Sequence, residues 1–370
     1  MSYGTLPSQQ TMFFDDRRNR LYEDALAAHI EPGMVVMDLG AGLGIHGLMA
    51  ARLGARRVYL VEPSRILAMT RQLVAANGLD DVVTCIEGSI EQVEIPEPCD
   101  VIVSVFTGNF LLMEDLLPSL FYARDACLAP GGVLLPDAAE MIVAPVDATR
   151  LYTKHIERWR ERYHELDLSV VRPFAANQLY SLPASEHEAR SLGPPVVLKS
   201  FDFMSATEAS VDETVQLEIS EDGTCHGILG WFRANLGEGV LKTGPDDAAM
   251  HWSQVFLPLS TPRSVRAGEK LSFHLNRPAF GEWSWALDGV RQSTFLSEPR
   301  TPASLQRRSG TFAGRRNRRG DALFEVLDKL RGECTIDAIV SHVCDVYPTE
   351  FPRERIARNF VNWVVQHYCE

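Results

Sequence analysis

The sequence predicts a protein of the α/β class, in which a doubly wound parallel sheet is followed by an antiparallel β-barrel with a helical arm and by a small helical C-terminal module. Between residues 21 and 145, apolar segments alternate with helical ones. After about residue 140, short alternating segments are separated by Gly, Pro, Asp and Ser, and the last fifty residues have helical periodicity. The first pattern is typical of a parallel sheet with crossover helices, and the second of an antiparallel barrel or sandwich.

The length and composition indicate a packed protein of more than one domain. The chain has 370 residues, of which 45% are hydrophobic, and one ordinary core holds roughly 100 to 200. Acidic residues number 49 and basic residues 36, which gives a net charge of −13. We expect no nucleic-acid partner, because wrapping a phosphate backbone needs surplus Lys and Arg.

The spacing of the cysteines and the length of the apolar runs indicate where in the cell the protein is found. The seven cysteines are widely spaced and contain no CxxC pair, so we expect neither a disulfide framework nor a metal site. No apolar run has the length of a signal-peptide core or of a membrane span. These features predict a cytoplasmic protein without a membrane partner.

The first predicted domain, residues 1–145, is a nucleotide-binding α/β domain that begins with an N-terminal helix. Its expected helices are 21–30, 45–54, 66–78 and 116–132, and its expected strands are 34–42, 57–64, 82–89, 99–105 and 133–136. Strands that are apolar throughout are buried on both faces, which is the rule in parallel sheets.

Three further regions complete the predicted organisation. Residues 146–299 combine a helical stretch at 153–166 with short strands at 215–220, 225–236, 251–260 and 270–278, which indicates the barrel and its helical arm. Residues 300–320 carry six arginines between 307 and 319 and are interpreted as a solvated linker. Residues 321–370 are expected to form the helical C-terminal module, with a helix cap at Thr335.

A glycine-rich loop between the first predicted strand of the sheet and the next helix is the strongest motif. Its residues are Asp38, Gly40, Gly42 and Gly44. Glycines let the backbone approach a ligand, and Glu62, at the end of the second strand, can accept both ribose hydroxyls. The GxGxG spacing favours S-adenosylmethionine over a dinucleotide. A glycine turn without a ligand is the alternative, and Glu62 together with Glu91 after the third strand argues against it.

Residues 9 to about 290 resemble the protein arginine methyltransferases. Met12, Arg18 and Tyr22 match the spacing of that family's N-terminal helix, and segments at 159–169, 230–232 and 250–252 match its dimerisation arm and barrel. The resemblance implies a Rossmann-like methyltransferase domain, S-adenosylmethionine as cofactor and a homodimer. The cofactor-binding residues that it implies are Arg18 for the carboxylate, Asp38, Gly40, Gly42 and Glu62 for the lining, and Glu91 near the adenine.

The segment that corresponds to the family's substrate loop departs from the family pattern. Two glutamates nine residues apart hold a guanidinium in the family, whereas here Val105 replaces the first and Glu114 keeps the second. A guanidinium is a poor nucleophile because its lone pairs are delocalised, and paired carboxylates align its fork. We therefore expect the acceptor to be another side chain of a peptide or protein: an amine, imidazole, hydroxyl, amide or carboxylate.

Glu114 and His251 are the predicted catalytic residues, and Val105, Thr107 and Asn109 form the predicted substrate loop. Glu114 also fits a residue that the dipole favours at a helix N-terminus, and His251 also fits a packed histidine of the barrel. Two alternatives to the main hypothesis stay open. One is an arginine N-methyltransferase that rebuilds its acid pair, for example with Asp115, and the other is a catalytically dead scaffold.

The C-terminal segment, residues 321–370, resembles the winged-helix module with which bacterial ribosomal-peptide-modifying enzymes hold the leader of their precursor. Its pattern is a leucine-rich helix, a Gly332 break, a Thr335 cap and a second helix. The resemblance implies a ribosomally made precursor as substrate, whose leader would add a strand to the module. A helical cap or a dimer contact is the alternative.

Overall fold

The computed structural model describes residues 4–183, 188–332 and 334–369. The chain divides into two compact units, Met1–Pro299 and Arg300–Glu370. No helix in the described ranges is long and apolar enough to cross a membrane. The described side chains also contain no group of three or more His, Cys, Asp or Glu that is arranged to hold a metal ion.

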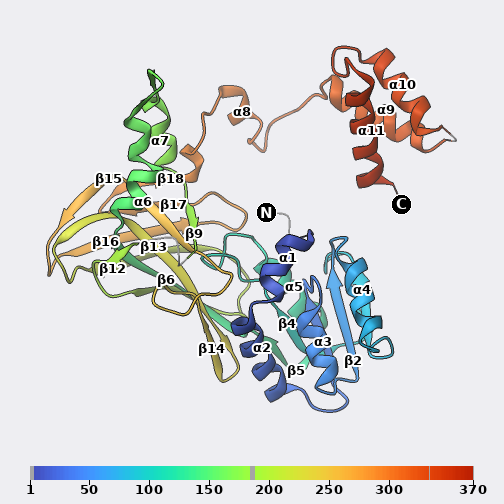
Figure 1. Cartoon of the computed structure of the whole chain (residues 1–370), viewed down its shortest axis with the longest axis horizontal. Helices are drawn as coiled ribbons and strands as arrows, with labels where there is room; N and C mark the ends of the chain where they lie inside the picture. Colours follow the sequence, from blue (N-terminus) through green and yellow to red (C-terminus); the bar gives the residue numbers. More distant parts are fainter. Residues whose placement is uncertain (1–3, 184–187, 333, 370) are drawn as a thin grey trace. The chain divides into compact units, whose positions relative to one another are not determined.

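The N-terminal part of the first unit is a five-stranded parallel sheet in the order β3-β2-β1-β4-β5 (Figure 1). Its strands are β1 (Val35–Leu39), β2 (Arg57–Glu62), β3 (Val83–Glu87), β4 (Cys99–Ser104) and β5 (Leu128–Leu135). The helices are α1 (Leu6–Phe13), α2 (Asp16–His29), α3 (Ile45–Arg52), α4 (Leu67–Ala76) and α5 (Leu117–Cys127). The strand order reverses between β1 and β4, and such switch points hold the ligands of doubly wound sheets.

The helix expected at 116–132 ends earlier than predicted. α5 stops at Cys127, and Leu128 is already extended and pairs with Cys99 of β4. Pro130 explains the difference, because proline lacks the N–H of a helix interior and pushes the preceding residue out of the helical region. The last strand of the sheet therefore begins five residues before the predicted start at 133.

Two antiparallel sheets form the predicted barrel-like domain. The larger sheet has seven strands, in which β6-β13-β15 is the centre, and the smaller has the order β12-β16-β17-β18. The strands are β6 (Ala138–Asp147), β9 (Tyr180–Leu182), β10 (Arg190–Ser191), β11 (Val196–Asp202), β12 (Val211–Glu218), β13 (Gly223–Leu236), β14 (Gly239–Lys242), β15 (Gln254–Val265), β16 (Lys270–Arg277), β17 (Ser284–Leu287) and β18 (Val290–Ser293). β6 runs across the expected domain boundary between residues 145 and 146.

One hydrophobic core joins the two domains of the first unit. It contains residues of the parallel sheet, such as Val36 and Ile102, together with residues of the barrel, such as Trp252 and Phe273. The loop after β4 supplies Phe110, which is fully buried and stacks on Trp283 at 5.7 Å. This shared core holds the carboxyl end of the parallel sheet against the barrel.

The arm projects from the barrel (Figure 1). It contains α6 (Thr149–His155), two short 3₁₀ turns, a hairpin of β7 (Arg162–Tyr163) and β8 (Leu166–Asp167), and α7 (Arg172–Ala175). The helical stretch expected at 153–166 is thus helical only as far as Arg160, and residues 162–167 form a hairpin instead. Tyr163, Leu166 and Val170 are 59%, 63% and 73% exposed, so the arm presents apolar side chains to solvent.

The second unit consists of helices. They are α8 (Pro302–Gln306), α9 (Arg318–Leu330), α10 (Ile336–Val346) and α11 (Glu354–Tyr368). Thr335 caps α10 as expected, since its hydroxyl accepts from the N–H of Ala338 at 3.3 Å. The described residues of this unit form no strand, so the sheet edge to which a leader strand would add is not found among them.

The Arg-rich segment is not simply solvated. The guanidinium of Arg316 lies 4.1 Å from the centre of the Phe324 ring, and Arg318 donates to Glu350 at 2.9 Å. Arg319 lies over the ring of Phe351 at 5.5 Å. Arg318 and Arg319 thus tie the start of α9 to the segment before α11, whereas Arg316 packs on α9 itself.

Candidate cofactor and acceptor site

The glycine-rich loop lies at the carboxyl end of β1 and adopts a backbone that other residues rarely take. Gly40 and Gly42 have φ of +72° and +54°, which costs glycine little. A Cβ on Gly40 would lie 2.1 Å from Phe106 Cε1, and one on Gly42 would lie 2.4 Å from Gln9 Oε1. A side chain at either position would be strained by the positive φ, and at Gly40 it would also meet the Phe106 ring. Phe106 therefore brings the loop after β4 into contact with the glycine loop.

Two buried acids shape this loop from within. Asp38 is 2% exposed and its Oδ2 accepts from the N–H of Gly47 at 2.8 Å. Burial raises the pKa of Asp38 to about 7, although the Gly47 hydrogen bond and the Arg18 charge act in the opposite direction. Glu62 accepts from the N–H groups of Gly42 and Ser64 at 2.9 and 2.8 Å. The predicted ribose ligand Glu62 is therefore also the residue that fixes the glycine loop.

Arg18 and Tyr22 lie one turn apart on α2 and are both buried. Arg18 donates from Nε and Nη2 to Asn19 Oδ1 at 3.1 and 2.8 Å. The Tyr22 hydroxyl donates to the carbonyl of Ser104 at 2.9 Å, which ties α2 to the end of β4. Glu91, by contrast, is exposed and accepts from the Ser119 hydroxyl at 2.5 Å.

The loop from residue 104 to 116, which we call the acceptor loop, is held against the barrel by its predicted polar residues. The carbonyl of Thr107 accepts from Trp252 Nε1 at 2.6 Å, and Asn109 Oδ1 accepts from the N–H of Ser253 at 2.9 Å. Asn109 thus anchors the loop through its side chain. Val105 is partly buried against the core and brings no charge to the site.

Glu114 and Asp115 have different surroundings. Glu114 is partly buried and lies on Gly108, where an added Cβ would be 3.0 Å from Glu114 Cγ. Asp115 pairs with the buried Arg277 and accepts from the N–H of Phe280 at 2.9 Å. Both Asp115 oxygens are therefore engaged with residues of the barrel, and the structure does not support Asp115 as a replacement for the missing glutamate.

His251 is paired with Asp15, a residue that the sequence did not single out. Asp15 Oδ2 accepts from the backbone N–H of His251 at 2.9 Å and lies 3.0 Å from its Nδ1. Burial lowers the pKa of His251, while Asp15 acts to raise it. Burial acts to raise the pKa of Asp15, but its hydrogen bonds with His251 and the Arg18 N–H bring it below the usual value. Asp15 is also the N-cap of α2. An aspartate just before a helix is the one feature of the sequence that could have indicated a structural role for this residue.

The buried polar atoms of this region fit a polar cofactor. Among the described residues, His46 Nε2, Ser104 Oγ and Thr107 Oγ1 are buried and have no hydrogen-bond partner, although proteins pair nearly all such atoms. The His46 ring stacks on Tyr22, which bonds Ser104. These atoms therefore lie among the residues predicted to hold S-adenosylmethionine, and the glycine loop leaves no room for a side chain.

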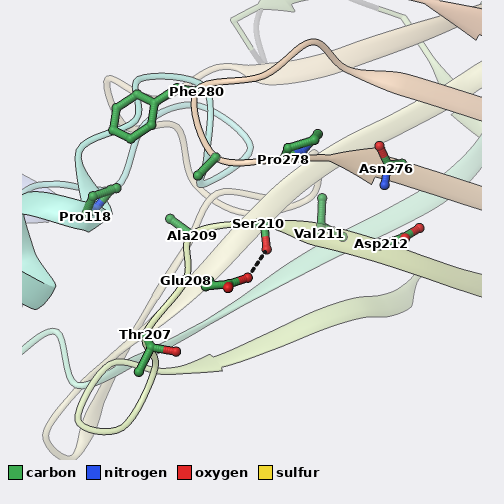
Figure 2. A pocket seen from close by; sticks show the side chains of 11 residues that line it. Pro118, Thr207, Glu208, Ala209, Ser210, Val211, Asp212, Asn276, Pro278 and Phe280 are labelled. Atoms are coloured by element: carbon green, nitrogen blue, oxygen red, sulfur yellow. Dashed lines mark hydrogen bonds between the residues drawn. The ribbon is translucent and has the colours of Figure 1, made fainter. Parts of the chain in front are cut away.

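A groove with a volume of about 590 Å³ opens beside the acceptor loop. Figure 2 shows it between the segment from Thr207 to Asp212 and the turn that carries Phe280, with Pro118 at one end. Glu208 and Asp212 supply negative charge, and none of its described lining residues is basic. Phe280 is 72% exposed, and Asp115 fixes its backbone.

Family models match both parts of the first unit. A methyltransferase domain matches residues 36–132, and the arginine methyltransferase oligomerization subdomain matches residues 137–281. Fold and matched regions thus define a protein that contains a methyltransferase domain.

Relatives and solved structures agree with these matches. The chain is 34% identical to human Protein arginine N-methyltransferase 2 over 72% of its own length and 65% of the relative's. It is 32% identical to Arabidopsis thaliana Protein arginine N-methyltransferase 1.1, over 73% of this chain and 71% of that one. The Trypanosoma brucei PRMT1 enzyme-prozyme heterotetrameric complex with AdoHcy superposes with a TM-score of 0.72 and 28% identity, over 79% of this chain and 99% of that one.

The chain belongs to the protein arginine methyltransferase family. The predicted resemblance, fold class and cofactor class are confirmed. The chain spans just under two thirds of the length of the human relative, and its C-terminal unit lies outside both matched regions.

Proposed function

We propose that the chain transfers a methyl group from S-adenosylmethionine to a nitrogen on a side chain of a peptide or protein. The observation that carries this proposal is the contact between the two loops: Phe106 of the acceptor loop covers Gly40 of the glycine loop. That contact brings the loop of Glu114 to the loop predicted to hold the cofactor. The cofactor, when bound, supplies an electrophilic methyl group.

The residues of the chain supply orientation and charge. Glu114 accepts a hydrogen bond from the acceptor nitrogen and balances its charge, which fixes the direction of attack. The paired Asp15 and His251 lie where α2 meets the barrel and receive the released proton or pass it to solvent. In-line displacement of this kind depends mainly on positioning.

The guanidinium of arginine is the first acceptor to test, because the named relatives are arginine N-methyltransferases. A second candidate, an amine or imidazole nitrogen, is favoured by one specific observation: Val105 removes one carboxylate and Asp115 does not replace it. A nitrogen that can lose its proton near neutral pH needs only one acid to orient it, whereas the guanidinium keeps its charge.

The test is transfer of a deuterated methyl group to a panel of peptides that carry arginine, lysine or histidine in otherwise identical sequences, followed by fragmentation to locate the methyl. Glu114→Gln is the matched inactive variant. Methyl on arginine supports the first acceptor and methyl on lysine or histidine the second. Binding of S-adenosylhomocysteine without transfer to any peptide would favour the dead scaffold.

We also propose that the arm mediates a homodimer. The region matches an oligomerization subdomain, and the exposed Tyr163, Leu166 and Val170 supply the apolar surface that such an interface needs. Sedimentation should give a dimer for the full chain. Substitution of the three residues by serine should shift it to a monomer, and an unchanged mass would refute this use of the arm.

A leader peptide bound by residues 321–370 is likewise a proposal. Strand addition has no support in the described residues, so binding would use helix surfaces. Trp363 and Tyr368 are 42% and 57% exposed on α11. Trp363→Ala in the full chain should weaken binding of a precursor with its leader and leave binding of the core peptide unchanged; equal binding of both would reject the module as a leader site.

A further inference from the structure

His46 is a buried histidine that the proposed chemistry does not use. It lies in the first turn of α3, directly after the glycine loop, and is 3% exposed. Its ring stacks on Tyr22, with centroids 4.4 Å apart and planes 30° apart. Nε2 has no hydrogen-bond partner among the described residues. An apolar side chain would pack in this place without burying an unpaired nitrogen.

The charged groups nearest to His46 indicate what its nitrogen meets. Burial holds the pKa of His46 well below its usual value, and the charges of Arg18 and His251 act in the same direction. The ring is therefore neutral, and one of its nitrogens is a donor. Arg18 precedes Tyr22 by four residues on α2, so both side chains lie on the same helix face.

Two potential donors therefore lie in the same region on different elements, Arg18 on α2 and His46 on α3, where the Arg18 charge acts on the His46 ring. The Arg18 guanidinium donates only to Asn19 among the hydrogen bonds described for it. Asp38 lies near Arg18, but its Oδ2 already accepts from the Gly47 N–H and burial raises its pKa to about 7, so it balances the Arg18 charge only in part. The ligand that satisfies a cation and a neutral donor together is an anion with two acceptor oxygens, that is, a carboxylate.

We propose that His46 binds the amino-acid end of the cofactor by donating a hydrogen bond from Nε2 to the carboxylate that Arg18 pairs with. This inference rests on the proposed function, since it requires S-adenosylmethionine as the ligand. His46 would then distinguish nucleosides that carry the amino-acid tail from those that lack it.

Calorimetry with two probes tests the proposal on the full chain. S-adenosylhomocysteine carries the tail, and 5′-methylthioadenosine lacks it. His46→Leu should weaken binding of the first by about tenfold, which is the ordinary contribution of a hydrogen bond to a charged group, and leave binding of the second unchanged. His46→Gln keeps a donor and should retain most of the preference. The apo form of His46→Leu should also melt higher than the wild type, because the unpaired nitrogen is gone.

His155 provides the matched control. Its ring lies tilted against Tyr180, with centroids 4.5 Å apart, and its Nε2 is also buried and unpaired among the described residues. It lies in α6 of the arm. His155→Leu should change the melting temperature but not the affinity for either probe. If His46→Leu weakens the binding of both probes equally, or of neither probe, the role of His46 is refuted and the proposed function is unaffected. A wild-type chain that binds neither probe would overturn both.

Discussion

Arg277 of β16 donates a hydrogen bond to Asp115 of the acceptor loop, 162 residues earlier in the chain. The Arg277 side chain is only 3% exposed and lies 5.3 Å from the Trp283 ring. Asp115 has a φ of +54°, and Phe110 and Leu111 in the same loop are also positive. Such backbones persist only where surrounding contacts impose them, so this pair is one of the contacts that set the position of Glu114.

Asp115→Asn should therefore loosen the acceptor loop without touching the cofactor. The asparagine can still accept from the Phe280 N–H, but it leaves the buried Arg277 charge unbalanced, which costs about 3 kcal/mol or more in unfolding free energy. We expect kcat for a peptide to fall by at least about tenfold, while the Kd for S-adenosylhomocysteine stays the same. Scanning fluorimetry and steady-state kinetics measure both. Arg358→Met is the control, because it breaks an exposed ion pair in the second unit. It should lower the free energy of unfolding by less than about 1 kcal/mol. An unaltered kcat would show that the pair serves stability alone.

Val105→Glu should restore the second carboxylate. Two acids then align the guanidinium fork, and we expect transfer to an arginine peptide to rise by about tenfold or more. Val105→Gln, of the same size and without charge, should give no rise. Mass spectrometry of initial-rate samples measures the effect. If the glutamate variant folds and methylates arginine no faster than the wild type, the missing carboxylate is not what limits this acceptor.

Phe280→Ala should weaken the binding of long basic peptides. The exposed ring lies toward the Pro118 end of the groove (Figure 2), which Glu208 and Asp212 also line, and it can stack there on a flanking guanidinium. We expect KM to rise by about threefold to tenfold for a peptide with a second arginine beyond the acceptor, and to stay unchanged for one without it. Val290→Ala removes another exposed apolar side chain, 57% exposed on β18, and should alter neither. A rise in KM for both peptides would exclude the groove as a site for the flank.

Asp38 should make the apo protein less stable as pH rises. Its pKa is raised to about 7 in the folded state by burial, whereas an unfolded aspartate titrates near about 3.9. The folded state thus holds the proton more tightly. The penalty is absent below about pH 4, grows between pH 4 and 7 and is complete above about 7, where it reaches about 4 kcal/mol at 1.36 kcal/mol per pKa unit. Asp38→Asn should flatten the decline of Tm across this window, and Asp337→Asn, on the surface of the second unit, should not. Parallel curves for Asp38→Asn and the wild type would contradict the assignment.

The sequence predicted the parts of the molecule that local patterns encode. The strands of the parallel sheet follow from apolar runs between helices, and the glycine loop follows from a motif whose φ values only glycine adopts readily. Where a single residue interrupts a pattern, the prediction failed: Pro130 ends α5 and starts β5 inside a segment with helical periodicity.

Contacts between distant residues were not predictable in this way. Asp15 and His251 are 236 residues apart, and the sequence around either residue does not indicate that the two are in contact. Thr107 and Asn109 were predicted to form the substrate loop, which stays a prediction. The Thr107 carbonyl and the Asn109 side chain hold the loop after β4 on the barrel, which only the packing of the two domains reveals. The C-terminal module was predicted as a winged helix from loose helix spacing, and helix spacing alone does not specify a sheet.

Methyl transfer to a peptide nitrogen next to Glu114 can be tested by locating the methyl group. The full chain is incubated with S-adenosylmethionine deuterated in its methyl group and with the matched arginine, lysine and histidine peptides, and each product is fragmented. We expect a deuterated methyl on a side-chain nitrogen, formed at a rate that Glu114→Gln reduces by about a hundredfold or more. Absence of label from every peptide, in a preparation that binds S-adenosylhomocysteine, would contradict this expectation.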